Sequence, residues 1–225
     1  MKNSVKKTLI IGLFLICTIM LIQYFSIGEY LTLEQLKNNK NYLKELVGNN
    51  YWYSVVVYLG IYISVIALCI PATPPLTIVG GFLFGLIPGL SYAFIGATIG
   101  STISFLIVRY VLKNTVSAYF QVQIEQFQKQ MSIYGMAIYL LILQLATIFP
   151  FFMINTLAAL AHVPLWVLIW TSAVGSFPSL FAYTLAGRQL CRIESVGDVF
   201  SPSIIIVFLL LILVALLPLF FRKFR

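Results

Sequence analysis

A proline interrupts each of two long apolar stretches of this chain, and the two interruptions have similar surroundings. Three pairs of residues keep one offset of 79 positions: Pro71 and Pro150, Gly96 and Gly175, and Arg109 and Arg188. In membrane proteins, Gly- or Pro-interrupted apolar segments at corresponding places in two halves indicate a transport site near the bilayer midplane. The sequence therefore predicts two related halves with a site between them.

The composition places both halves in a membrane. Hydrophobic residues make up 61% of the chain and charged residues only 9%, whereas soluble domains are roughly 45–50% apolar. The net charge of +8 is not gathered into basic stripes with interleaved aromatic residues, so we expect no nucleic-acid partner. The sequence predicts a polytopic membrane protein whose basic residues set its orientation.

The three cysteines do not form the pattern of a metal or disulfide site. Cys17, Cys69 and Cys191 are scattered along the chain, and two of them lie inside apolar segments. Neither a disulfide framework nor a metal-ligand cluster has this spacing. We therefore expect packing roles for these thiols, and we expect neither a metal nor a cofactor.

The two ends of the chain are expected to hold membrane anchors. Region 1–50 begins with the basic segment 1–7, and the uncharged stretch 8–27 that follows is about 20 residues long and can span a bilayer. The polar stretch 29–50 opens with a Thr-Leu-Glu-Gln capping box and predicts a helix lying in the interface, although a solvated connector fits equally well. Region 188–225 predicts a final transmembrane helix over 203–221 and a basic tail.

Between these ends, a helical hairpin is predicted over 51–88. The apolar stretch 51–70 is interrupted by the prolines of 71–75, and a 12-residue apolar piece, 76–87, follows. At ~1.5 Å per residue this piece extends about 18 Å, which is too short for a hydrocarbon core of ~30 Å. We therefore predict that the hairpin enters the membrane and returns to the same face, and that a full span over 90–108 comes next.

The second half of the central region, which covers 51–187 as a whole, repeats this order. An amphipathic interfacial helix is predicted over 113–134, because apolar residues recur there at spacings of three and four. A second hairpin over 135–163, broken at Pro150, and a full span over 164–186 complete the region. The predicted fold class is an all-α integral membrane protein with an inverted repeat of two re-entrant helical hairpins. Each hairpin precedes a transmembrane helix, and further transmembrane helices flank the repeat.

The distribution of basic residues predicts the orientation. If both broken stretches are re-entrant, nine Lys and Arg residues fall on the side of the two termini and five on the opposite side. Cytoplasmic loops carry the excess of Lys and Arg, so both termini are expected in the cytoplasm. If the stretches 51–70 and 135–149 cross the bilayer fully, the bias is weaker, and the sequence leaves this alternative open.

An ordered set of motifs resembles a known family. The motifs are Pro71-Ala-Thr-Pro-Pro75 with Gly80, Gly81 and Gly85, then Gly96-Ala-Thr-Ile-Gly100 and Phe105-xxx-Arg109, then Phe149-Pro-Phe151 with Asn155, and finally Gly175-Ser-Phe-Pro178 with Gly187. Together they resemble the DedA superfamily, and most closely its SNARE-associated Golgi protein branch, which is known as the VTT domain. The resemblance covers roughly residues 51–187.

The resemblance implies two re-entrant hairpins that enter from opposite faces and a role in moving lipids between leaflets. Bacterial members are linked to recycling of undecaprenyl phosphate and eukaryotic members to phospholipid scrambling; for this chain we expect the bacterial cytoplasmic membrane. Two departures matter: Gln144 lies where members commonly carry an arginine, and all six acidic residues lie in polar connectors. A proton-driven carrier needs a titratable group at membrane depth, and only His162 and tyrosines remain, so we expect passive or weakly coupled movement.

The candidate substrate-binding residues lie at the proline breaks, on close-packing faces and at the ends of the long spans. A proline leaves a backbone carbonyl group without its helical hydrogen-bond partner. Such a break is compatible with a site lined by water or with a simple helix kink. Glycines allow helices to pack closely. An arginine can bind a lipid phosphate or anchor the orientation of the chain in the membrane. The side-chain amides of Gln144 and Asn155 lie in apolar segments and need hydrogen-bond partners. The set is Pro71, Thr73, Pro74, Pro75, Gly80, Gly81, Arg109, Gln144, Pro150, Asn155, Gly175, Pro178 and Arg188.

Membrane lipids are the expected partners, and the expected function is that of a translocase or scramblase. It would move anionic head groups, of phospholipid or of undecaprenyl phosphate, between leaflets. An ion-coupled secondary transporter of a small solute is the alternative that the same symmetry allows. Catalysis is not expected, because His162 is the only histidine and no nucleophile motif accompanies it. The sequence leaves open the identity of the lipid and whether the chain forms a homo-oligomer.

Overall fold

The computed structural model describes residues 45, 47–113, 117, 119–146 and 150–192. These residues form helices and turns, without a strand, so the predicted all-α class is confirmed for the described part of the chain. Three predicted elements lie wholly or mostly outside it: the span 8–27, the helix 29–50 and the span 203–221.

The first pair of helices is joined by a turn at the predicted proline break. Helix α5 (Tyr51–Ala67) ends in a Schellman motif, in which the N–H of Ile70 donates to the carbonyl of Val65. Helix α6 (Thr73–Phe84) then begins with prolines in its first turn, where a missing N–H breaks no helical hydrogen bond. The prolines thus start α6 three residues earlier than the predicted position 76.

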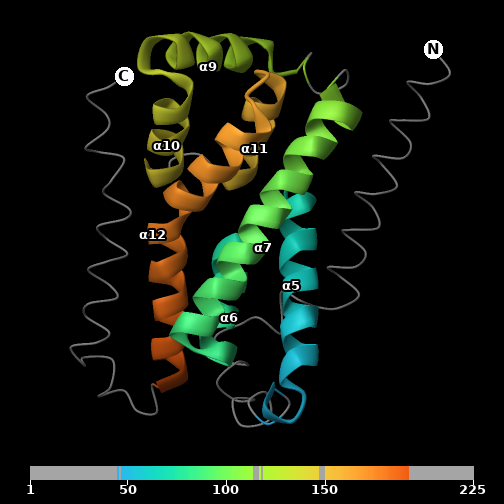
Figure 1. Ribbon diagram of the computed structural model, residues 1–225, viewed down its shortest axis with the longest axis vertical. Helices are drawn as coiled ribbons and strands as arrows, with labels where there is room; N and C mark the ends of the chain where they lie inside the picture. The colour runs from blue at the N-terminus through green and yellow to red at the C-terminus, as the bar shows by residue number, and fades with distance from the viewer. Residues whose placement is uncertain (1–44, 46, 114–116, 118, 147–149, 193–225) are drawn as a thin grey trace, which may run out of the picture.

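Helix α7 carries the chain along the whole length of the described structure. It covers Leu86–Ile107, begins directly after Gly85 at φ 84°, and continues into a π-helical turn, η1 (Val108–Leu112). In Figure 1, α5 rises from the bottom of the view, α6 returns to the bottom, and α7 runs from there to the top. The start of α5 and the end of α6 therefore lie at the same end of the molecule.

The second half begins with an amphipathic helix across the top of Figure 1. This helix, α9, covers Gln121–Tyr134, the later part of the predicted range 113–134, and buries Phe127 and Met131. Helix α10 (Met136–Ala146) descends from it after Gly135, at φ 82°.

Helices α11 and α12 complete the described chain. Helix α11 (Phe151–Leu160) runs back toward the top of the view. It ends in a second Schellman motif, with the N–H of Val163 donating to the carbonyl of Ala158. Helix α12 (Leu165–Arg192) then descends to the bottom and contains Pro178 in its interior.

The two long helices keep the sequence offset at their first residues. In the described part of the chain, two stretches have the length and composition to cross a membrane, Leu86–Leu112 and Leu165–Cys191. Their first residues lie 79 positions apart. The offset that relates the prolines therefore also relates the starts of the two long helices.

The packing of the helices also follows a pattern of halves. Each long helix packs against the first helix of its own half, so that α7 contacts α5 and α12 contacts α10. Each long helix also packs against the short helix of the other half, so that α7 contacts α11 and α12 contacts α6. The two halves are thus held together by α6 and α11 and by direct packing of α7 against α12.

Glycines permit the closest of these approaches. A Cβ atom at Gly187 of α12 would collide with the carbonyl of Ile78 on α6, and one at Gly81 of α6 would collide with the carbonyl of Thr184 on α12. Backbone touches backbone at both positions, so α6 and α12 lie nearer to each other than larger side chains would permit.

Candidate functional site

A cavity of about 240 Å³ lies where the two proline breaks meet, and Pro71 and Pro150 both line it. Both halves contribute to its wall. The lining residues are Ile66, Ile70, Pro71, Thr73, Pro74, Ala97, Gln144, Pro150, Phe151, Phe152, Ile154, Ser176, Ser179, Leu180 and Tyr183.

Two helix N-termini open onto this cavity. Thr73 and Pro74 belong to the first turn of α6, and Phe151 and Phe152 belong to the first turn of α11. Neither terminus has a hydrogen bond from a capping side chain. The N-terminus of a helix carries a partial positive charge and unused N–H donors, although the prolines of α6 remove some of these donors. The cavity therefore favours a negatively charged or electron-rich group.

Gln144 supplies the cavity with a buried amide. Its side chain is only 4% exposed, and its Nε2 donates to the hydroxyl of Ser172 at 2.9 Å. Its Oε1 has no hydrogen-bond partner among the described residues. Leaving a buried polar atom unpaired costs about 1–3 kcal/mol, so this amide is a natural contact for water or a ligand.

Gly175 makes the position of Gln144 possible. A Cβ atom at Gly175 would lie 2.7 Å from the Cβ of Gln144, which is closer than side chains approach one another. On the first half, Gly96 accommodates the ring of Tyr62 in the same manner. The Gly96 and Gly175 pair thus has one role in both halves, which is to admit a large side chain from the neighbouring hairpin helix.

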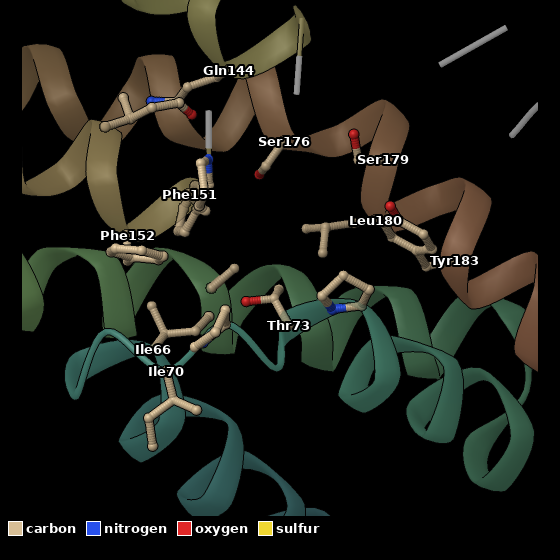
Figure 2. Close-up of a pocket in the computed structure, with 15 residues that line it drawn as sticks. Ile66, Ile70, Thr73, Gln144, Phe151, Phe152, Ser176, Ser179, Leu180 and Tyr183 are labelled. Atoms are coloured by element: carbon tan, nitrogen blue, oxygen red, sulfur yellow. The ribbon is translucent and has the colours of Figure 1, made fainter. Parts of the chain in front are cut away.

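The remaining polar groups of the wall are neutral hydroxyls. Figure 2 shows Thr73 on one side of the cavity and Ser176, Ser179 and Tyr183 of α12 on the other. No charged side chain lines the cavity in the described part of the chain. The wall can hydrogen-bond to a polar group, but it has no side chain that would hold an ion strongly.

The structure brings together five of the predicted site residues and separates the others. Pro71, Thr73, Pro74, Gln144 and Pro150 line the cavity. The remaining predicted residues, Pro75, Gly80, Gly81, Arg109, Asn155, Gly175, Pro178 and Arg188, do not line it.

Several of the separated residues have packing contacts instead. Gly80 lies against the ring of Tyr58, and Gly81 lies against the backbone of α12. Asn155 is fully buried in α11, and neither atom of its amide has a partner among the described residues. Together with Gln144, Asn155 is thus a buried amide that lacks a hydrogen-bond partner among the described residues. It lies on α11, the helix whose N-terminus opens onto the cavity.

The two arginines lie at opposite ends of the molecule. Arg109 lies in η1, at the end of the α7 stretch that reaches the top of Figure 1, and Arg188 lies near the end of α12, at the bottom. The guanidinium of Arg109 donates to the carbonyl of Val163 at 2.9 Å. Neither arginine belongs to the cavity.

Ser176, Ser179 and Tyr183 are site residues that the sequence did not single out. Their spacings of three and four place them on one face of α12. Three hydroxyls on one face of a membrane-crossing helix are the signal that would have identified them.

The family model of the VTT domain matches residues 70–189. The transmembrane protein 41 homolog of Dictyostelium discoideum is 28% identical over 183 residues, which are 80% of this chain and 55% of that protein. The transmembrane protein 41B of Xenopus tropicalis is 25% identical over 171 residues, which are 75% of this chain and 62% of that protein.

A relative from Caenorhabditis elegans, also a transmembrane protein 41 homolog, is 24% identical over 193 residues, with 85% of this chain and 78% of that protein covered. The chain spans less than two thirds of the length of the Dictyostelium and Xenopus relatives. No solved structure matches the chain significantly.

Proposed function

The chain belongs to the VTT domain family and is a membrane protein, and from that premise we propose that it moves the head groups of anionic lipids between leaflets. The observation that carries the proposal is the cavity between the two proline breaks. Both halves build it, two uncapped helix N-termini open onto it, and a buried amide with a free oxygen lines it.

The proposal includes two re-entrant hairpins, α5–α6 and α10–α11. Helix α6 has 12 residues and helix α11 has 10, so they extend about 18 and 15 Å and cannot cross a ~30 Å core. In Figure 1 the first pair enters from the bottom and the second from the top. The reciprocal packing of α6 on α12 and of α11 on α7 supports an inverted repeat.

A mainly apolar wall with a few neutral polar groups suits passage of a head group better than its tight retention. A conducting path must bind its cargo strongly enough to admit it and weakly enough to release it. The helix N-termini offset part of the cost of bringing a phosphate into the membrane, whereas a buried cationic side chain would retain it. Because no carboxylate lines the cavity in the described part of the chain, we propose passive movement rather than proton coupling.

The same proposal assigns the two ends of the molecule to the two leaflets. The end with α9 and Arg109 faces the cytoplasm, together with both chain termini, and the end with Arg188 faces the other side. The cytoplasmic end carries the larger share of the basic residues in the sequence. The acyl chains remain in the lipid while the head group passes between the hairpins, so no bond is made or broken.

Leaflet exchange in vesicles tests the proposal. The purified chain is reconstituted with a fluorescent phosphatidylglycerol, and a membrane-impermeant reductant bleaches the label in the outer leaflet. We expect bleaching to proceed beyond half of the label in vesicles with protein and to stop there in vesicles without it. Gln144→Leu removes the amide at the cavity, and we expect exchange to slow by about tenfold, which corresponds to ~1.4 kcal/mol.

Gln126→Leu is the matched control, because Gln126 is exposed on α9, away from the cavity. It makes the same chemical change, and we expect it to leave exchange unchanged. If the wild-type chain accelerates exchange of no anionic lipid, the proposed function is wrong. Uptake of a small solute that depends on an imposed ion gradient would support the alternative of a coupled secondary transporter.

A further inference from the structure

A cluster of basic side chains lies at the top end of the molecule, outside the cavity. It consists of Arg109 in η1, Lys113 directly after η1, and His162 in the turn between α11 and α12. The ammonium group of Lys113 donates to Nε2 of His162 at 2.7 Å, and both side chains are exposed. Arg109 donates to the carbonyl of Val163, the residue that follows His162.

The positive charges of this cluster have only neutral partners. The hydrogen bonds of the two cations go to a carbonyl and an imidazole, and the ring of Phe105 lies 5.4 Å from the guanidinium of Arg109. In the part of the chain that the structure describes, no carboxylate forms an ion pair with either cation. A guanidinium has five donors and an ammonium has three, so most donors remain for a ligand.

The backbone on both sides of the cluster has an uncommon conformation. Arg109 lies in the π-helical turn η1, and such turns are frequent at functional sites. His162 has a φ of 62°, a left-handed conformation that glycine and asparagine adopt more easily. The imidazole of His162 therefore lies beside Lys113 although glycine or asparagine would adopt this backbone conformation with less strain.

Two exposed aromatic residues place the cluster at the level of the lipid head groups. Tyr110, next to Arg109, is 73% exposed, and Trp166, in the first turn of α12, is 72% exposed. Exposed Tyr and Trp at the ends of membrane-crossing helices mark the boundary between hydrocarbon and water. At this depth the anions available to Arg109 and Lys113 are the phosphates of lipids.

We propose that Arg109, Lys113 and His162 form a binding site for the phosphate group of an anionic lipid in the leaflet at this end of the molecule. The guanidinium and the ammonium donate to the phosphate oxygens, and His162 orients the ammonium. The inference rests on the proposed function, because the site would collect head groups before they reach the cavity. Its test measures binding, so it does not depend on transport.

The full chain, purified in detergent micelles, is mixed with equal amounts of phosphatidylglycerol and phosphatidylcholine, and the bound lipids are counted by native mass spectrometry. We expect the wild-type chain to retain phosphatidylglycerol preferentially. Lys113→Gln should reduce this preference about tenfold, since it removes a charge-assisted hydrogen bond to the phosphate. Lys113→Arg should restore most of it.

His162→Asn removes the ring and keeps the left-handed turn, because asparagine tolerates this conformation. We expect it to weaken the preference in the same direction as Lys113→Gln. Lys129→Gln on α9 is the matched control, since Lys129 is exposed and lies outside the cluster. It removes one positive charge, and we expect it to leave the preference unchanged.

Three outcomes would overturn this assignment. In the first, Lys113→Gln retains phosphatidylglycerol as the wild-type chain does. In the second, Lys129→Gln loses the preference equally, so that total charge and not the cluster is responsible. In the third, inorganic phosphate binds in a Lys113-dependent manner while the two lipids are retained equally. The wild-type leaflet exchange described above tests the transport function separately.

Discussion

Single residues control how closely the two halves approach each other. Gly187 and Gly81 bring the backbones of α12 and α6 into contact, and Gly175 leaves room for Gln144 at the wall of the cavity. In each case the missing side chain, and not a polar group, determines the geometry. The sequence alone could not identify the partner of each glycine.

We predict that Gly187→Ala destabilises the protein by about 1–3 kcal/mol, the usual cost of an overpacked core. The added methyl group would meet the carbonyl of Ile78 and would lie 3.0 Å from the backbone nitrogen of Phe82, and a backbone cannot move aside as a side chain can. The free energy of unfolding, measured by titration with SDS in mixed micelles, checks this prediction.

Gly60→Ala is the control for this prediction. Gly60 lies in the interior of α5, and a Cβ atom there would meet nothing within 4 Å. The substitution should therefore stabilise the helix by up to ~1 kcal/mol. Equal stability of the two alanine variants would mean that α6 and α12 do not approach each other as described.

Among the elements, the two turns that end α5 and α11 have an unexpected composition. Both are Schellman motifs, yet Cys69 and His162 occupy the left-handed position at φ 59° and 62°. Glycine is the usual residue there. The Sγ of Cys69 lies 3.1 Å from the hydroxyl of Ser104 on α7, and His162 contacts Lys113, so each side chain joins its turn to the α7 stretch.

We predict that Cys69→Val lowers the free energy of unfolding by about 1–2 kcal/mol, because a β-branched residue is strained in the left-handed region. Cys69→Gly should be more stable than Cys69→Val by at least about 1–2 kcal/mol, because glycine adopts the left-handed conformation freely. Cys191→Val, on the regular helix α12, makes the same change without the strain and should have a small effect. If Cys69→Val and Cys191→Val are equally stable, the backbone of the turn is not left-handed.

For the whole molecule, the depth of the two turns decides the topology. In Figure 1 the α5–α6 pair and the α10–α11 pair run inward from opposite ends of the molecule. Residues of both pairs line the cavity. The function proposed above requires that both turns stop inside the membrane. Full crossing of the broken stretches, the alternative that the sequence left open, would place them at the surfaces.

We predict the following labelling pattern for single cysteines in a chain whose native cysteines are replaced. In sealed vesicles, an impermeant maleimide should reach Asn50→Cys and Ile87→Cys from one side and Lys129→Cys from the other. It should reach Ala72→Cys, in the turn between α5 and α6, from neither side, because a turn within the bilayer is shielded from aqueous reagents. Labelling of Ala72→Cys from the Lys129 side would show that the α5–α6 pair crosses the membrane.

Much of the architecture could be predicted because it depends on length and apolar content. The two long helices, the amphipathic helix α9 and the breaks at Pro71 and Pro150 follow from hydropathy and from the chemistry of proline. Helix α6 begins three residues before the predicted position 76, because two of the prolines fit the first turn of the helix and do not delay its start.

The 79-residue offset, the proline breaks and the hydropathy are local properties of the chain, so they were enough to predict an apolar, all-helical membrane protein with two related halves. Which residues face one another became clear from the three-dimensional packing alone. The packing placed Ser176, Ser179 and Tyr183 in the cavity wall and Arg109 and Arg188 outside it, and it gave the oxygen of Gln144 no partner among the described residues. The physical reason is that a side chain's surroundings depend on contacts between distant helices, and these contacts depend on how closely backbones pack at a few glycines.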